Sequence, residues 1–234
     1  CCIGGTLNMT YLALRFSRYV NGVALLHEQV SESMFPGYPI DAVTNGVHAP
    51  TWVSRPFSEL FDRHIPNWPR SPQYMRYALG IPRSDIRAAH AEAKKQLLAE
   101  VQLRTGKELN PDVFTIGFAR RATGYKRAAL FFSDLERLRR IVRSGRRMQV
   151  VLAGLAHPND VSGQDMIRAV FRAARELGDE LPVVYMEGYN MALARFMVSG
   201  VDLWLNTPLK PHEASGTSGM KAALNGVPSF SVVD

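Results

Sequence analysis

Basic residues cluster in a segment that joins an apolar stretch to an expected helix, residues 118–127. The segment reads Phe-Ala-Arg-Arg-Ala-Thr-Gly-Tyr-Lys-Arg and contains Arg121, Lys126 and Arg127. Arginine can grip an oxyanion through two parallel N–H donors, whereas lysine acts as a point charge. Helix starts after buried strands are common ligand sites, so these residue types predict an anion-binding turn.

A second segment, residues 213–221, places small residues before a lysine. Its sequence is Glu-Ala-Ser-Gly-Thr-Ser-Gly-Met-Lys, and its backbone N–H groups could approach a phosphate or a sugar closely. We expect Lys221 in the first turn of a helix, where the dipole and nearby cations would lower its pKa and favour reaction with a carbonyl. The Walker spacing is absent. A glycine-rich turn before an amphipathic helix remains the alternative.

A third segment, residues 44–52, contains an Asn-Gly turn and ends at Trp52. Taken alone, Trp52 is as well explained by core packing as by a binding role. His27, His64 and His90 have no partner at metal-ligand spacing, so we expect them to be structural and predict no metal site.

The elements that must position these segments follow an alternating pattern in the second half of the chain. Strands are expected at 113–118, 148–153, 182–186, 201–205 and 228–233, and helices at 85–105, 127–142, 164–177, 192–199 and from 218. Alternation of this kind predicts an α/β fold, a Rossmann-like parallel sheet with flanking helices. We place a domain boundary near residue 110, with a mostly helical segment over 1–110 and the Rossmann-like domain over 111–234.

Before that boundary the pattern is less regular. Apolar spacing predicts one helix over 7–30, and Pro and Gly predict a loop over 34–56 with a short strand at 40–44. For the helix at 85–105 we expect Ser84 as the N-cap and Gly106 as the stop. Four polar residues are expected on its exposed face: Glu92, Lys94, Lys95 and Glu100.

Composition excludes several classes of protein. The chain has 234 residues, 46% hydrophobic and 21% charged, which is typical of a globular protein. There is no apolar run of membrane-spanning length and no secretory signal, so we expect no membrane contact and a cytoplasmic location. The two cysteines, Cys1 and Cys2, cannot form a disulfide framework. The missing initiator Met and the abrupt end suggest a piece of a longer protein.

The formal net charge is +7, and much of the excess lies between residues 119 and 147. Such a segment could bind nucleic acid, an acidic surface or a phosphorylated small molecule. No aromatic residues are interleaved for base stacking, so we expect no nucleic-acid partner. For residues 137–147 a solvated helix face is the simpler interpretation.

Together, these segments resemble the α-glucan (glycogen, starch and maltodextrin) phosphorylase family, in its shorter bacterial and archaeal form. The motifs that carry the resemblance are Asn8-Met-Thr, Tyr19-Val-Asn-Gly-Val23, Thr44-Asn-Gly-Val-His48 with Trp52, Gly117-Phe-Ala-Arg-Arg121 with Tyr125-Lys-Arg127, Gly188-Tyr189 with Met191-Ala-Leu-Ala-Arg195, and residues 213–221 followed by Asn225-Gly226. The resemblance implies the GT-B architecture, two Rossmann-like domains facing each other across a cleft.

The resemblance also implies an activity. Inorganic phosphate would attack the non-reducing end of an α-1,4-glucan and release glucose 1-phosphate with retention, and the phosphate of pyridoxal 5′-phosphate would serve as acid and base. A homo-oligomeric parent protein is a further expectation. The cofactor-free alternative is a GT-B glycosyltransferase with a nucleotide-sugar donor, in which the same cations would hold a diphosphate.

The family's functional residues carry over to this sequence by position. For the cofactor the resemblance implies Lys221 as its lysine, with Thr217, Arg120, Trp52 and Tyr189 around it. For substrate phosphate it implies the catalytic residues Arg121 and Lys126. For the sugar it implies these contacts: Asn45, Tyr125, Glu213, Ala214, Ser215 and Gly216.

Some positions depart from the family pattern. Arg120 stands where many members have a lysine, and Leu155 stands where a lysine is usual. Residues 122–124 and 209–212 also differ. Because the resemblance covers only part of the family's chain, we expect this 234-residue piece to be inactive or nearly so when it is isolated.

Overall fold

The structure is a computed structural model, and it describes residues 2–3 and 5–232. Its centre is a five-stranded parallel sheet with the order β7-β6-β5-β8-β9. The strands are β5 Phe114–Ala119, β6 Met148–Ala153, β7 Val183–Met186, β8 Leu203–Asn206 and β9 Ser229–Ser231. The chain order reverses between β5 and β8, which is the doubly wound arrangement. The predicted Rossmann-like parallel sheet is confirmed.

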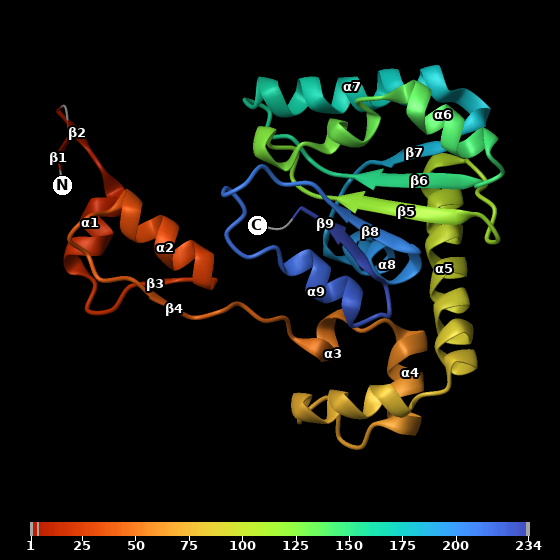
Figure 1. The fold of residues 1–234 in the computed structure, drawn as a ribbon, viewed down its shortest axis with the longest axis horizontal. Helices are drawn as coiled ribbons and strands as arrows, with labels where there is room; N and C mark the ends of the chain where they lie inside the picture. Colours follow the sequence, from red (N-terminus) through yellow and green to blue (C-terminus); the bar gives the residue numbers. More distant parts are fainter. Residues whose placement is uncertain (1, 4, 233–234) are drawn as a thin grey trace.

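Helices cover both faces of the sheet (Figure 1). One face carries α6 Leu135–Arg143 and α7 Val161–Leu177, and the other carries α5 Arg83–Thr105, α8 Met191–Gly200 and α9 Thr217–Ala223. Each face has its own apolar core, and the fully buried Trp204 lies on the α8 side. Gly117 allows close packing there, because a Cβ atom at this position would lie 2.6 Å from Val201. Short helical turns complete the domain: η2 Gly124–Lys126, η3 Ala128–Phe132 and η4 Gly178–Glu180.

A separate helical unit packs on the first turns of α5. It consists of α3 Ala49–Trp52, α4 Arg55–His64 and η1 Pro72–Gly80. Its core contains Phe57, Leu60 and Trp68, together with Ala89 of α5. The long helix α5 therefore belongs to two cores at once, this one and the core beneath α8.

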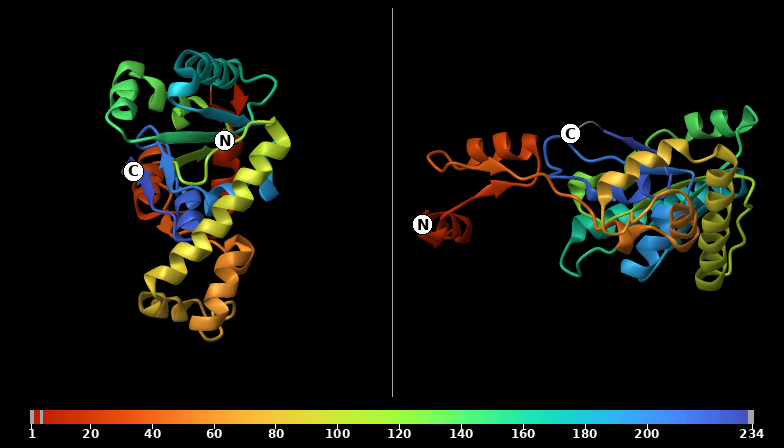
Figure 2. Two further views of the ribbon diagram at one scale, coloured as in Figure 1. Left: turned by 90° about the vertical axis from the view of Figure 1, so that its right-hand side faces the viewer. Right: turned by 90° about the horizontal axis from the view of Figure 1, so that it is seen from below.

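The N-terminal elements form an arm that extends from the rest of the molecule (Figures 1 and 2). They are β1 Cys2–Ile3, β2 Thr6–Leu7, α1 Met9–Phe16, β3 Asn21–Gly22, α2 Leu25–Met34 and β4 Asp41–Ala42. β3 pairs in parallel with β4, within the strand expected at 40–44.

The prediction of one helix over 7–30 is wrong. Asn8 caps α1 by accepting hydrogen bonds from the N–H groups of Thr10 and Tyr11, and the helix ends before Ser17. The chain then extends into β3, and Gly22 packs against the backbone of Glu28, where a Cβ atom would lie 2.8 Å away. Apolar residues at helical spacing continue through the extended stretch between α1 and α2, at Tyr19, Val20 and Val23, so periodicity alone could not show the break.

Two expectations for α5 also fail. The helix begins at Arg83 after Pro82, and the Ser84 hydroxyl bonds the Asp85 carboxylate and caps nothing. Lys94, expected on the exposed face, is buried and bonds Asp202 and the carbonyl of Val113. The stop at Gly106 is confirmed by its left-handed backbone, φ 69°.

The helix expected at 127–142 is divided. η3 ends at Phe132, and Asp134 then caps α6 by accepting from the N–H of Arg137. The basic residues of α6 are partly paired, since Arg139 contacts Glu136, Glu176 and Glu180. Of the strand expected at 228–233, β9 covers 229–231, and Val233 lies outside the described residues. Among the described residues no helix is long and apolar enough to cross a membrane.

Candidate functional site

The candidate residues gather at the carboxyl ends of β5 and β8, where the strand order reverses. Arg120 directly follows β5, and its N–H bonds the carbonyl of Ala153 at the end of β6. The backbones approach closely here, because a Cβ atom at Gly154 would lie 2.3 Å from the Arg120 carbonyl oxygen. β8 ends at Asn206, and the glycine-rich segment returns to the same edge before α9. Ligands of open α/β sheets bind at this kind of edge.

Three charged side chains meet there in a partly buried cluster. Glu213 Oε2 pairs with Arg120 Nη1 and lies 3.5 Å from Lys126 Nζ. The exposed fractions of the side chains are 5% for Arg120, 12% for Lys126 and 13% for Glu213. Two cations therefore share one carboxylate in a site with little water, where charge interactions are strong.

Ser218 fixes the arginine of this cluster. Its hydroxyl oxygen accepts from Arg120 Nη2 and from Trp204 Nε1, each at 3.1 Å. Trp204 belongs to β8 and is fully buried on the α8 side of the sheet, and its indole and the Arg120 guanidinium are held by one hydroxyl oxygen. The side chain that positions Arg120 was not predicted, although Ser218 lies inside the segment that was singled out.

Lys221 lies on the same face of α9, one turn after Ser218. Its Nζ is 3.8 Å from the ring centroid of Trp52, within the range of a cation–π interaction. Burial lowers the pKa of the Lys221 amine. The prediction that Lys221 falls in the first helical turn is wrong, since α9 begins at Thr217 and Lys221 is in its last turn. There the dipole favours the charged amine, so burial and not the dipole lowers the pKa.

Asn225 holds this lysine and tryptophan together. Its Nδ2 donates to the carbonyls of Trp52 and Lys221, each at 2.9 Å, and its Oδ1 accepts from the N–H of Ser54 at 2.7 Å. The side chain is completely buried. From the sequence Asn225 was recognised only as part of a motif, and the helix-ending Asn-Gly pair was the signal that could have suggested a role.

The two aromatic residues expected beside the cofactor pack on one core. Trp52 and Tyr189 both lie against the cluster that contains Trp204 and Ala222. Burial raises the pKa of Tyr189, and the positive charge of Arg120 partly opposes this. Trp52, Tyr189 and Arg120 are thus placed around the same region of the site.

The residues expected to contact sugar, Glu213, Ala214, Ser215 and Gly216, line a pocket of about 160 Å³. The other lining residues are Ala24, Leu26, Asn206, Ser231 and Val232. Gly216 has a left-handed backbone, φ 62°, and precedes α9.

Asn206 is a further polar side chain of this pocket, and no sequence argument had identified it. Its Nδ2 donates to Ser231 Oγ at 2.8 Å. Its Oδ1 is buried and has no hydrogen-bond partner among the described residues.

Other residues predicted for the site lie outside the charged cluster or at its margin. Arg121 is exposed, and Arg127, expected in the anion site, instead bonds the carbonyls of Thr207 and Pro208. Asn45 is exposed near the pocket's edge, since its N–H bonds the carbonyl of Val23, next to Ala24. The Tyr125 ring lies 5.1 Å from Lys126 Nζ.

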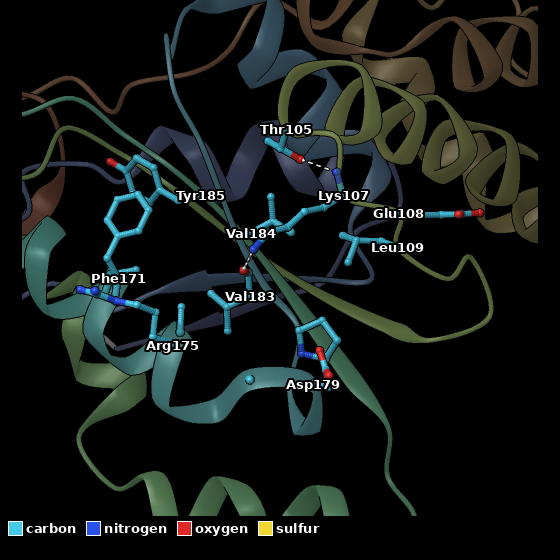
Figure 3. A pocket seen from close by; sticks show the side chains of 14 residues that line it. Thr105, Lys107, Glu108, Leu109, Phe171, Arg175, Asp179, Val183, Val184 and Tyr185 are labelled. Carbon is cyan, nitrogen blue, oxygen red and sulfur yellow. Dashed lines mark hydrogen bonds between the residues drawn. The ribbon is translucent and has the colours of Figure 1, made fainter.

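A larger cavity of about 550 Å³ lies away from these residues, beside the outer strand β7 (Figure 3). Phe171 and Tyr185 form one wall with ring centroids 5.2 Å apart, and Lys107 Nζ reaches the carbonyl of Val183 at 3.4 Å. None of the predicted site residues lines it. Size alone therefore does not identify the chemically equipped site.

Comparison with known proteins gives a consistent result over nearly the whole chain. The sequence model of the carbohydrate phosphorylase family matches residues 3–234. The chain is 38% identical to a glycogen phosphorylase of Aquifex aeolicus over 97% of its own length and 37% of that protein. It is 37% identical to a maltodextrin phosphorylase of Thermococcus litoralis, over 99% of the chain and 31% of that protein.

A glycogen phosphorylase of Mycobacterium tuberculosis is 36% identical over 97% of the chain and 30% of that protein. The chain thus spans about a third of the length of the curated relatives it matches. The family match and these identities show that this chain belongs to the carbohydrate phosphorylase family.

Proposed function

We propose that this protein is an α-1,4-glucan phosphorylase, which uses inorganic phosphate to release glucose 1-phosphate from the non-reducing end of glycogen or maltodextrin with retention. The names of its relatives support the reaction class. The observation that carries the proposal is Lys221, an amine with a lowered pKa that lies against Trp52 and one helical turn from the residue that holds Arg120.

The residues present fit pyridoxal 5′-phosphate. Lys221 is a partly buried amine beside an aromatic ring, which suits attachment of an aldehyde. Arg120 and Thr217 would hold the cofactor's phosphate, and Trp52 and Tyr189 would pack around its ring. When bound, the cofactor supplies a phosphate group that can exchange a proton with substrate phosphate.

Arg121 and Lys126 would bind the substrate phosphate. Lys126 already lies in the charged cluster, and the exposed Arg121 would have to turn toward it. Cations fixed beside developing charge contribute more in a dry site than in water. Glu213, Ala214, Ser215 and Gly216 would bind the glucosyl hydroxyls, with Asn45 and Tyr125 as further contacts.

The 234-residue chain is expected to release little glucose 1-phosphate when assayed by itself. Water must be excluded from the reacting groups, and the relatives devote about two thirds of their length to parts outside this match. The domain division near residue 110, the cytoplasmic location and the homo-oligomeric parent stay predictions.

Reductive labelling tests the cofactor proposal directly. The chain is incubated with pyridoxal 5′-phosphate, reduced with borohydride and mapped by peptide mass spectrometry. We expect a single adduct on Lys221, and none in the K221A variant. Lys95, a lysine of α5, serves as the control position. Labelling spread equally over both positions would contradict the proposal and favour the cofactor-free glycosyltransferase, which binding of a nucleotide sugar would then support.

A further inference from the structure

Glu213 lies at the boundary between two parts of the site. On one side its carboxylate contacts the two cations, Arg120 and Lys126. On the other side the same residue lines the pocket that contains Asn206. The Glu213 carboxylate can therefore pair with the two cations or turn toward the pocket. Its position determines whether its negative charge lies beside the cations or beside a ligand in the pocket.

The charges of the cluster do not balance. Arg120 and Lys126 bring two positive charges, and Glu213 brings one negative charge, all in side chains that are 13% exposed or less. A buried cation without a partner is strongly unfavourable, so Glu213 is needed when no other anion is present. The remaining positive charge still favours a further anion, and a phosphate group offers several acceptor oxygens and up to two negative charges.

Phosphate and Glu213 would compete for the same donors. A phosphate group that contacts both Arg120 and Lys126 would stand where the Glu213 carboxylate now stands. Two anions at contact distance repel each other, so the phosphate would favour a Glu213 that has turned away. Ser218 keeps Arg120 in place during such an exchange, because its bond to Nη2 does not involve Glu213.

The adjacent pocket gives the displaced carboxylate a function. Its lining includes Asn206, whose Nδ2 donates to Ser231 Oγ and whose Oδ1 is buried without a partner among the described residues. Besides Glu213 the pocket is lined by the polar side chains of Asn206, Ser215 and Ser231, and such a lining fits a ligand rich in hydroxyl groups. A Glu213 carboxylate turned into the pocket would add two acceptor oxygens for the same ligand.

We propose that Glu213 is an exchangeable counter-ion: a phosphate group displaces it from Arg120 and Lys126, and the released carboxylate then accepts hydrogen bonds from a sugar in the pocket. Phosphate and sugar binding are thereby coupled, and each strengthens the other. This deepens the proposed function and rests on it, since it assigns the order in which one residue serves two ligands.

The first experiment measures inorganic phosphate binding by calorimetry in the wild-type chain and in E213Q. Removal of the internal competitor is expected to tighten phosphate binding about tenfold. The matched control is E180Q, which removes a carboxylate paired with Arg139 and Arg143 outside the site and should leave binding unchanged. Equal or weaker phosphate binding by E213Q would overturn the proposal.

A second experiment needs only the wild-type chain and stays informative if E213Q does not fold. Glucose binding is followed by saturation-transfer NMR with and without phosphate, and we expect about fivefold tighter binding when phosphate is present. Glucose affinity that is independent of every phosphate compound overturns the proposal. Inorganic phosphate, pyridoxal 5′-phosphate and phosphate-free pyridoxal are compared, so that free phosphate and the cofactor's phosphate are distinguished as the displacing group.

The two proposals fail in different ways. Absent labelling of Lys221 together with tighter phosphate binding by E213Q would refute the cofactor role and leave the exchange in place. A clean Lys221 adduct together with unchanged phosphate binding by E213Q would refute the exchange and leave the cofactor role.

Discussion

Two clusters of partly buried charges lie at opposite ends of β5 and β8, and they are built differently. At the amino end Asp202 accepts from His90 Nε2 at 2.9 Å, Lys94 Nζ at 2.7 Å and the Thr115 N–H at 2.6 Å. At the carboxyl end Arg120 and Lys126 share Glu213. The first cluster pairs one carboxylate with one lysine and surrounds it with donors, whereas the second has a surplus cation.

This difference separates a structural cluster from the cluster at which we propose a binding site. Asp202 joins β8 to α5 and to β5 with both of its oxygens in use. Such a cluster has little to gain from a further ion. The cluster around Glu213 keeps a net positive charge, and a polar pocket adjoins it. Incomplete neutralisation, more than burial, distinguishes the end of the sheet at which we propose the site.

The largest effect is expected from D202A, which removes the only carboxylate seen to pair with Lys94 in the described structure. Loss of one partner leaves a buried ammonium uncompensated, which costs about 3–5 kcal/mol of unfolding free energy. Urea denaturation followed by circular dichroism measures this loss. As a control, D165A breaks an exposed pair with Arg168 and should change stability by less than about 1 kcal/mol. Similar losses in the two variants would contradict the comparison.

Asp202 should also make stability depend on acid pH. Burial alone would raise its pKa, but hydrogen bonds from His90, Lys94 and the Thr115 N–H hold the pKa below its ordinary value. A depressed folded-state pKa means that the contribution to stability is complete above the unfolded-state pKa and is lost as pH falls through the folded-state pKa. Unfolding free energy measured against pH should therefore decline less steeply in acid for D202N than for the wild type, and identical slopes would exclude this role.

N225A should be the next most harmful change. It removes one acceptor and two donor contacts from a fully buried position, leaving the Ser54 N–H and the Trp52 carbonyl without this partner. We expect a loss of about 3 kcal/mol, since each unsatisfied buried group costs about 1–3 kcal/mol. Thermal denaturation measures it, and Lys221 labelling should fall in parallel. Unchanged labelling would show that Asn225 serves stability alone.

S218A is expected to have a smaller effect on stability, about 2 kcal/mol, because two buried donors lose an acceptor. The consequence at the site is specific, since Arg120 loses a contact that does not depend on Glu213. Calorimetry should find weaker phosphate binding in S218A than in the wild type. Binding of equal strength would show that the Glu213 pair alone positions the guanidinium.

The smallest effect concerns the pH at which Lys221 reacts. Burial lowers its pKa, so a neutral amine is present at lower pH than for an ordinary lysine. The initial rate of labelling by pyridoxal 5′-phosphate, measured against pH, should rise earlier for Lys221 than for Lys95 in the same digest. Coincident profiles would show that the environment beside Trp52 does not tune the amine.

The sheet could be predicted because each strand is marked by a short run of neighbouring apolar residues in the sequence. Strand 148–153 was predicted with its final bounds, since six consecutive residues of this kind suit a strand buried on both faces. The positions of Arg120 and Glu213 at one edge followed from strand alternation. Local patterns could not show that residues 7–30 turn back, because the break depends on the pairing of β3 with β4 and on contact between Gly22 and Glu28.

Long-range polar contacts could not be predicted at all. Lys94 and Asp202 are 108 residues apart, and nothing in the helical pattern around Lys94 distinguishes a buried ammonium from an exposed one. The partner of Arg120 and the unpartnered oxygen of Asn206 are likewise properties of the folded chain. The predicted cause of the lowered Lys221 pKa was wrong although the predicted start, residue 218, lies one residue from the observed start at Thr217. The helix ends at Ala223, so Lys221 lies in its last turn, and the sequence pattern did not show how short the helix is.

Three connected parts of the fold support Lys221. The first is α5, which is joined to the strands through Lys94 and Asp202. The second is the unit of α3 and α4, which packs on the first turns of α5, and the third is α9. Asn225 connects α3 to α9, because its side chain bonds the carbonyls of both Trp52 and Lys221. The spacing between the Trp52 ring and the Lys221 amine is therefore fixed by a contact that lies outside the charged cluster, and loss of this contact would allow α3 and α9 to move relative to each other.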